Sequence, residues 1–253
     1  MSVIPSWTVL FGGAGRHGVI ERMHQENIEI SQVIIPKKRS EKLDFSISIL
    51  SKLNLPIVEV DKAQLSNLLR PSNGGSLLSL GFPILISAEV LSRFVFAVNV
   101  HPTLLPNYRG PNSGAYVLIN DEKFAGSTVH LMTDKIDQGS IINQSSVPLS
   151  KFDTIRSMQR KVYESEPNLV IQALKLLQAN APMIQQQEEE SSFYARRSPK
   201  DSEIDPNKSL IALFDEIRSC DPVDFPAYFF IGGEKVCVRM WRPDKPSQEY
   251  DLI

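Results

Sequence analysis

The sequence predicts an α/β fold: a mostly parallel sheet with helices on both faces, followed by a small C-terminal helix and β-hairpin appendage. Three observations support this class. Short apolar runs alternate with helical spacing in the order βαβαβ over the first 60 residues. The runs are almost continuously apolar, as in strands that are buried on both faces. The composition, 42% hydrophobic and 22% charged over 253 residues, is that of an ordinary globular protein with a sizeable core.

The N-terminal elements follow from local pattern. An apolar run ends in Gly12-Gly13-Ala14-Gly15, and the next residues have helical spacing at Val19, Ile20 and Met23, which indicates a strand, a tight turn and a helix. The second run stops at Pro36. The predicted strands are residues 7–11, 32–35 and 56–60, and the helices between them are residues 17–26 and 45–53.

The middle of the chain continues the sheet. Residues 77–86 are expected to form a strand, a bulge and a turn, residues 88–94 a short helix and residues 96–100 another buried strand. Residues 127–132 and 140–147 alternate in polarity, which predicts an edge hairpin with its turn at residues 134–139. A strong helical stripe covers residues 153–179, and Pro167 is expected to interrupt or kink that helix.

The composition changes to a Gln/Glu/Ser tract at Gln185. We therefore expect a catalytic domain of residues 1–184 and an extension of residues 185–253, with a helix at residues 209–218 and an aromatic hairpin that turns at Gly232-Gly233. Cys220 and Cys237 fit no zinc spacing, so both are expected to be buried structural cysteines.

Charge and targeting patterns narrow the function classes. A net charge of −2 and a pI near 6.1 argue against a dedicated nucleic-acid binder. The N-terminus lacks the features of a secretion signal, and no apolar run is long enough to span a bilayer. The expectation is a cytoplasmic protein with no membrane partner.

Asn99 and His101 stand at the end of a predicted strand. Being two residues apart, they point to the same face of an extended segment, where one supplies amide donors and the other a titratable imidazole. Ligands of open parallel sheets bind beyond these strand ends. Asp137 lies in the predicted hairpin turn, where an ordinary turn aspartate is the simpler interpretation.

The order of several short motifs resembles the catalytic signature of the formyltransferases that use 10-formyltetrahydrofolate. The resemblance is strongest over residues 77–145 and implies a Rossmann-like domain with Asn99, His101 and Asp137 as catalytic residues. Thr103 departs from it, since serine is commoner there. The motifs are Asn99-x-His101, Leu104-Leu105-Pro106, Arg109-Gly110, Gly126-Ser127-Thr128-Val129-His130 and Asp137-x-Gly139.

That chemistry suits these side chains. When a substrate amine attacks the formyl carbonyl, Asn99 and protonated His101 would stabilise the oxyanion, and Asp137 would hold the His101 tautomer and help to remove the amine proton. No metal is required. The resemblance also implies that the folate lies against two loops, with cofactor-binding residues Phe82, Pro83, Ile84, Leu85, Ile86, Leu91, Lys135, Ile136 and Gln138. Alternatively, Phe82 and Leu91 are core residues.

Three amines compete as acceptor: glycinamide ribonucleotide, the methionyl end of initiator tRNA and a nucleotide-linked 4-amino sugar. Residues 194–201 resemble the continuation in the last two classes. The tRNA enzymes add a C-terminal barrel, whereas this sequence stops at Ile253, so a nucleotide-linked amino sugar such as GDP-perosamine, used in O-antigen and lipopolysaccharide biosynthesis, is expected. The expected substrate-binding residues are Tyr108, Arg109, Gly110, Arg196 and Arg197, with surface charge as their alternative role.

The apolar hairpin at residues 225–241 is a candidate homodimer surface, because family members often dimerise through this part.

Two other classes stay open. Gly13-x-Gly15-x-x-Gly18 after a strand matches the dinucleotide fingerprint, so an NADP-binding oxidoreductase is possible, although Pro36-Lys37-Lys38-Arg39 stands where the ribose-binding acid is expected. A catalytically inactive binding protein that kept the fold is the third possibility. An oxidoreductase would leave the pattern of residues 99–139 unexplained, and the intact Asn99, His101 and Asp137 disfavour an inactive binding protein.

Overall fold

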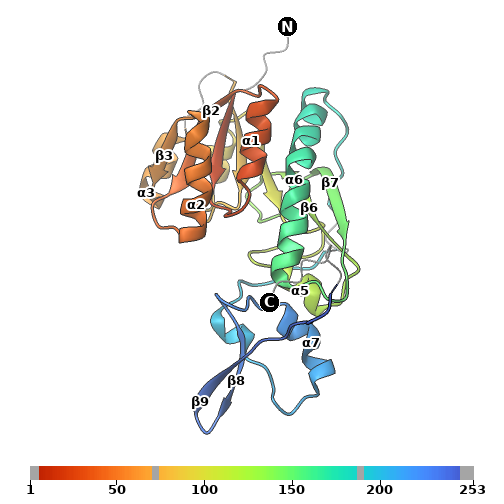
Figure 1. The fold of residues 1–253 in the computed structure, drawn as a ribbon. Helices are drawn as coiled ribbons and strands as arrows, with labels where there is room; N and C mark the ends of the chain where they lie inside the picture. The colour runs from red at the N-terminus through yellow and green to blue at the C-terminus, as the bar shows by residue number, and fades with distance from the viewer. Residues whose placement is uncertain (1–5, 70–73, 187–190, 246–253) are drawn as a thin grey trace.

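The structure, a computed structural model, describes residues 6–69, 74–186 and 191–245 (Figure 1). Residues 1–5, for which no secretion signal is expected, lie outside the described residues. So does most of the Gln/Glu/Ser tract. In the described part of the chain, no helix combines the length and apolarity needed to cross a membrane.

A seven-stranded sheet in the order β3-β2-β1-β4-β5-β6-β7 forms the centre of the molecule (Figure 1). The first five strands are parallel, and β6 and β7 add an antiparallel hairpin at the edge. This confirms the predicted α/β class and the edge hairpin. The strands are β1 Trp7–Phe11, β2 Ile30–Pro36, β3 Ile57–Val60, β4 Ser76–Leu80, β5 Ala97–His101, β6 Phe124–Leu131 and β7 Ile141–Pro148.

Helices cover both faces of the sheet. The apolar sides of α1, α2 and α6 pack on one face, together with Val98, Val100 and Val129. The other face packs against α3 and α4. Because successive strand residues alternate in direction, Asn99, His101 and His130 must project from the α3–α4 face. The helices are α1 His17–Gln25, α2 Glu41–Leu50, α3 Lys62–Leu68, α4 Ala88–Leu91, α5 Gly114–Ile119 and α6 Ile155–Gln178.

Several helices differ from expectation. Helices α3 and α5 were not predicted; α3 begins with a capping box between Asp61 and Gln64, and α5 has only six residues. The predicted interruption at Pro167 is wrong, because α6 runs unbroken through it. A proline costs one backbone hydrogen bond, but α6 buries Glu166, Leu169 and Val170 on either side of it. Core packing therefore holds α6 on both sides of the proline.

The C-terminal part contains α7 Leu210–Arg218 and a hairpin of β8 Ala227–Ile231 and β9 Glu234–Val238, below the sheet in Figure 1. It is bonded to the main domain through Arg218, which is buried and donates to the carbonyls of Asp153 and Leu118. The Arg156–Asp221 pair also joins the two parts. Cys220 is buried as expected, whereas Cys237 is exposed because β9 has no covering layer.

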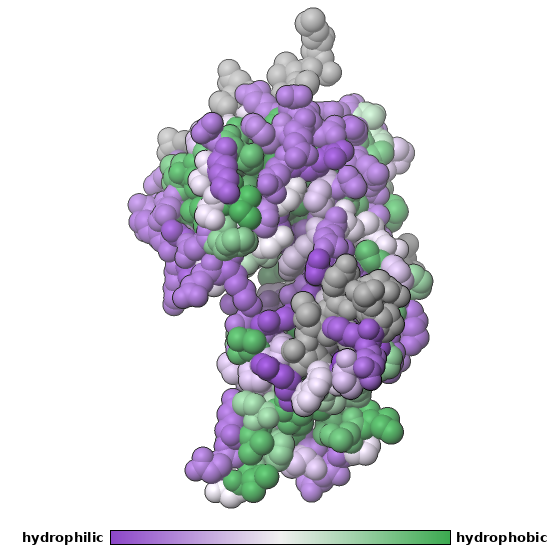
Figure 2. Space-filling model, in the orientation of Figure 1, coloured by the Kyte–Doolittle hydropathy of each residue, from purple (hydrophilic) through white to green (hydrophobic). Residues whose placement is uncertain are grey.

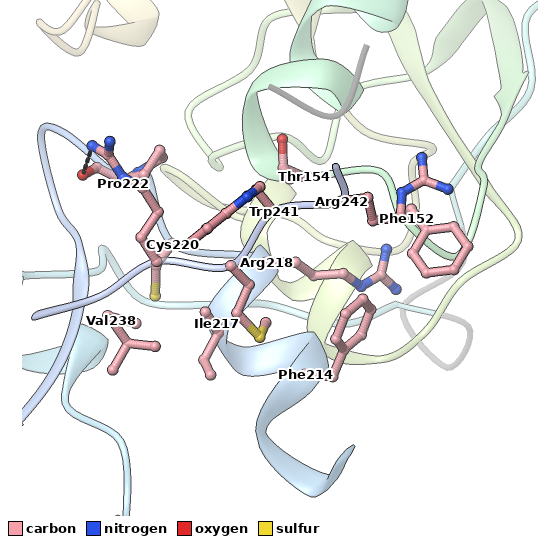
Figure 3. Close-up of a pocket in the computed structure, with 13 residues that line it drawn as sticks. Phe152, Thr154, Phe214, Ile217, Arg218, Cys220, Pro222, Val238, Trp241 and Arg242 are labelled. Atoms are coloured by element: carbon pink, nitrogen blue, oxygen red, sulfur yellow. Dashed lines mark hydrogen bonds between the residues drawn. The ribbon is translucent and has the colours of Figure 1, made fainter. Parts of the chain in front are cut away.

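An apolar cavity of about 80 Å³ lies between this part and the start of α6 (Figure 3). Phe152, Phe214 and Trp241 line it. None of the residues predicted to take part in catalysis or folate binding borders this cavity, so it belongs to the junction between the two parts of the chain.

Candidate active site

The candidate site is built at the carboxyl end of β5. In the antiparallel register of β5 and β6, Asn99 stands opposite His130 and His101 stands opposite Thr128. Residues that are directly opposite in such a pair share a face and lie close together. The prediction that Asn99 and His101 share one face is therefore met, and two further polar side chains from β6 join them.

The ring of His101 is fixed by a backbone carbonyl. Its Nε2 lies 2.9 Å from the carbonyl oxygen of Tyr108, and because a carbonyl only accepts, Nε2 carries the hydrogen. The other nitrogen, Nδ1, lies 3.5 Å from Asp137 Oδ2. The tautomer is thus set by Tyr108 rather than by Asp137, and Nδ1 is the nitrogen that can exchange a proton beside the carboxylate.

Asp137 reaches the strand end from the hairpin turn between β6 and β7. Its backbone adopts a positive φ of 54°, which Asp tolerates better than most residues. Its Oδ2 accepts the Gly110 N–H at 3.0 Å, and its Oδ1 lies 3.7 Å from His130 Nε2. Two residues on, a Cβ at Gly139 would stand 1.8 Å from the Leu131 carbonyl oxygen, so the Asp137-x-Gly139 spacing needs glycine for steric reasons.

His130 is a member of the cluster that sequence reasoning did not assign to the site. Its Nδ1 lies 2.8 Å from the Leu131 carbonyl oxygen and must donate to it. The free Nε2 then accepts from Asn99 Nδ2 at 3.1 Å. Burial lowers the pKa of His130 to about 4, which keeps the ring neutral and able to accept. His130 could have been found from the antiparallel register of β5 and β6, because that register places it opposite Asn99.

Polar contacts hold the loop that follows β5. Thr128 Oγ1 donates to the Thr103 carbonyl and accepts from the Leu105 N–H. The Thr103 hydroxyl donates at 3.0 Å to the Tyr108 carbonyl. The Tyr108 hydroxyl donates to Glu122 at 2.6 Å, and burial raises the pKa of this hydroxyl. These bonds fix the Tyr108 carbonyl that sets the His101 tautomer.

The residues predicted to bind the acceptor are dispersed. Tyr108, Arg109 and Gly110 lie at the catalytic cluster, but Arg109 is only 3% exposed and donates twice to Gln186 Oε1. Arg196 is exposed. Arg197 lies over the Tyr116 ring and donates to the Asp201 carbonyl.

The predicted folate loops flank the cluster. In residues 82–86, Phe82, Ile84 and Ile86 are half-buried against the α4 side of the core, whereas Pro83 and Leu85 are exposed. Leu91 is buried, which agrees with the alternative that it is a core residue. In the opposite turn, Lys135 and Ile136 are exposed and Gln138 is half-buried. Met132, which precedes that turn, packs on the same core cluster as Ile84. Exposed apolar side chains next to backbone donors and acceptors suit the binding of a flat heteroaromatic ring.

The glycine-rich turn is packed against protein. The N–H groups of Gly12 and Gly13 both donate to the Leu80 carbonyl, and a Cβ on Gly12 would stand 2.8 Å from Pro83 Cδ. A dinucleotide fingerprint keeps such a turn open for a pyrophosphate. This packing disfavours the oxidoreductase alternative.

Comparisons with known proteins agree with the geometry. Residues 17–174 match the family model described as formyl transferase. A methionyl-tRNA formyltransferase of Lactococcus lactis subsp. cremoris is 32% identical over 192 residues, which are 72% of this chain and 58% of that protein. This chain therefore spans little more than half of that relative.

Two solved structures have the same fold. A 4-N formyltransferase from Francisella tularensis has a TM-score of 0.77 at 21% identity and covers 94% of this chain and 97% of its own. The sugar 3N-formyl transferase WlaRD, solved with dTDP and 5-N-formyl-THF, has a TM-score of 0.66 at 19% identity over 85% of this chain and 79% of its own.

The lowered pKa of His130 has a measurable consequence. Between pH 6.5, the ordinary histidine value, and about 4, the unfolded chain binds a proton that the folded chain does not. Stability contributed by neutral His130 is therefore present above pH 6.5 and lost as the pH falls towards 4, by about 1.4 kcal/mol per pH unit. Urea unfolding at pH 7, 5.5 and 4.5 should show a smaller loss for His130→Gln than for the unsubstituted chain.

The matched control is His24→Gln at an exposed position of α1. This variant should lose as much stability between pH 7 and 4.5 as the unsubstituted chain. Equal pH dependence in His130→Gln and the unsubstituted chain would contradict the burial of a neutral imidazole.

Proposed function

Because this chain belongs to the formyl transferase family, we propose that it transfers a formyl group from 10-formyltetrahydrofolate to the 4-amino group of a nucleotide-linked amino sugar. The observation that carries the reaction is the cluster of Asn99, His101 and Asp137 at the end of β5, in which Asp137 lies 3.5 Å from the proton-exchanging nitrogen of His101. These groups match an amine acylation without a covalent enzyme intermediate.

Each catalytic residue has a distinct task in this proposal. The folate supplies the formyl group. Asn99 donates one amide N–H to His130, which leaves its second N–H for the oxygen of the carbonyl under attack, where negative charge develops. His101 Nδ1 takes the proton that the amine loses on forming the new C–N bond, and Asp137 stabilises the resulting imidazolium. The same Nδ1 would return this proton to the folate nitrogen when its bond to the formyl carbon breaks and tetrahydrofolate leaves.

We propose that the folate is held by the two loops that flank this cluster. The residues are Phe82, Pro83, Ile84, Leu85 and Ile86 on one side, with Leu91 supporting them from the core, and Lys135, Ile136 and Gln138 on the other. The exposed Leu85 and Ile136 offer apolar contact, and the loop backbones offer donors and acceptors to the ring edge. WlaRD, which has the same fold, was solved in the presence of 5-N-formyl-THF.

An amino sugar is the acceptor we favour because a sugar N-formyltransferase from Shewanella sp. matches 94% of this chain with a TM-score of 0.74. A methionyl-tRNA formyltransferase from Clostridium thermocellum matches 91% of this chain with a lower TM-score of 0.64. GDP-perosamine, for O-antigen and lipopolysaccharide assembly, is the specific sugar to test first. The second candidate is methionyl-tRNA, which the 32% identity to a methionyl-tRNA formyltransferase supports.

The acceptor side of the site would draw on both parts of the chain. We propose a catalytic domain of residues 1–184 and an extension of residues 185–253 that completes it. The Arg109 guanidinium is bonded to Gln186, and the backbone of Arg109 pairs with Ser192 and Tyr194. Arg109 thus orders the acceptor loop through the extension, and exposed Arg196 is the better candidate for a phosphate.

We also propose a homodimer through the C-terminal hairpin. Figure 2 shows apolar residues gathered on this end of the molecule. Exposed apolar patches of this kind mark association surfaces. The exposed apolar residues there include Val223, Phe225, Phe230, Ile231, Val236 and Trp241.

The acceptor is tested by following tetrahydrofolate release from 10-formyltetrahydrofolate with a panel of nucleotide-linked 4-amino sugars, glycinamide ribonucleotide and methionyl-tRNA. We expect turnover with at least one sugar and none with the other two amines. Turnover with methionyl-tRNA alone would establish the second candidate, and no tetrahydrofolate release with any acceptor would reject formyl transfer.

The catalytic assignments are tested by His101→Ala, Asp137→Asn and Asn99→Ala in the same assay. Removing a group that acts on the developing charge or on the proton lowers kcat by about 100-fold or more, while the melting temperature should change little. His24→Ala, an exposed histidine of α1, is the control and should keep full turnover. Near-normal kcat in His101→Ala or Asp137→Asn would remove that residue from the mechanism.

The dimer is tested by Ile231→Glu and Val236→Lys on the exposed hairpin. A charge at the centre of an apolar interface should shift the mass measured by light scattering from dimer to monomer at micromolar concentration. Phe124→Glu, at an exposed apolar residue of β6, is the control and should leave the mass unchanged. A monomeric unsubstituted chain would refute this proposal.

A further inference from the structure

A buried ion pair lies on the opposite side of the sheet from the candidate site. Arg16, just before α1, is 2% exposed and Glu166, in α6, is 0% exposed. Arg16 donates through Nε to Glu166 Oε2 at 2.6 Å and through Nη2 to Oε1 at 2.7 Å. Ser127 Oγ in β6 donates to the same Oε1 at 2.6 Å. The carboxylate therefore accepts from three protein donors.

The pair also bonds to the strand that carries the site. Arg16 Nη2 donates to the Val100 carbonyl at 3.0 Å. Val100 is the residue between Asn99 and His101. The pairing of β4 with β5 ends at Leu80 and Val100, and Gly81, with a φ of 65°, then turns the β4 chain away. Arg16 thus supplies a donor at the strand end.

Stability alone is a weak reason for such a pair. Removing two charges from water costs several kcal/mol each, and well-packed apolar residues of similar volume are often as stabilising or more so. What an apolar pair cannot do is fix the direction of a carbonyl. A site whose reacting groups must be held within about 0.5 Å needs that kind of support behind it.

The glycine-rich turn is shaped around Arg16. A Cβ on Gly13 would stand 2.6 Å from Arg16 Cδ, and the guanidinium nitrogen Nη1 lies close to Gly81. The Arg16 side chain also runs beside Tyr163 of α6. Gly13, the first glycine of the apparent dinucleotide motif, therefore leaves room for the Arg16 side chain.

We propose that Arg16 and Glu166 are positioning residues, which hold the Val100 peptide and through it the directions of Asn99 and His101. Ser127 completes the same unit, because it is the neighbour of Thr128, the residue opposite His101. The proposal rests on formyl transfer for its kinetic consequences but not for its structural ones.

The test replaces the unit with apolar residues, as Arg16→Met/Glu166→Leu/Ser127→Ala. If the unit positions the strand end, this variant keeps cooperative folding but its kcat falls about 10- to 100-fold, with the KM of both substrates changed less than about threefold. Arg16→Lys keeps a positive charge for Glu166 but loses the guanidinium group that also donates to the Val100 carbonyl. Its kcat should lie between those of the triple variant and the unsubstituted chain.

A second readout needs no activity. The chain has four histidines, so the ring nitrogens of His101 can be followed by ¹⁵N NMR. We expect the Nε2–H tautomer in the unsubstituted chain and shifted or averaged His101 signals in the triple variant and in Arg16→Lys. The control Arg22→Met/Glu26→Leu removes a partly exposed pair at the C-terminal end of α1, where Glu26 also lies 3.7 Å from Lys175, and should change neither kcat nor the spectrum.

Unchanged kcat and unchanged His101 signals in a folded triple variant would overturn the proposal. If the triple variant does not fold, Arg16→Lys decides, and signals identical to the unsubstituted chain reject the positioning role. If the unsubstituted chain has no formyl transfer, the proposed function fails, whereas the NMR comparison still tests this inference.

Discussion

The antiparallel register of β5 and β6 is the constraint on which the rest of the site depends. It places Asn99 opposite His130 and His101 opposite Thr128, on the face away from α1 and α6. A slip of β6 by one residue would turn His130 and Thr128 towards those helices, away from Asn99 and His101. The same register puts Thr128 where it holds the loop after β5, and this loop supplies the carbonyl that fixes His101.

The sequence predicts most of the sheet because buried parallel strands are near-continuous apolar runs, and the edge hairpin because it alternates. It could not predict α5, which is six residues long, or α3, whose evidence is one capping box. The expected break at Pro167 failed because local propensity does not count tertiary burial. Glu166, the residue before the proline, accepts from three donors on elements far away in sequence, and local propensity does not include such contacts.

The candidate site was predictable in proportion to how local its signals are. Asn99 and His101 follow from period-two geometry, whereas Asp137 rested on family resemblance, because a turn aspartate has no local mark of function. His130 requires the strand register. Arg109 shows the opposite difficulty: its charge suggested a phosphate, but its guanidinium is bonded to Gln186, 77 residues away, and no local pattern foretells such a contact.

Two backbone carbonyls fix the tautomers of the two histidines. Tyr108 holds the hydrogen of His101 on Nε2, and Leu131 holds that of His130 on Nδ1. The remaining ring nitrogens therefore face Asp137 from two sides, at 3.5 and 3.7 Å. One carboxylate cannot offset two buried imidazolium charges, and burial, assisted by the nearby His101, lowers the pKa of His130. In the proposed reaction His101 is therefore the ring that takes the proton, while His130 stays an acceptor for Asn99. The carbonyl that each ring contacts therefore separates the proposed roles: His101 carries the charge, and His130 orients Asn99.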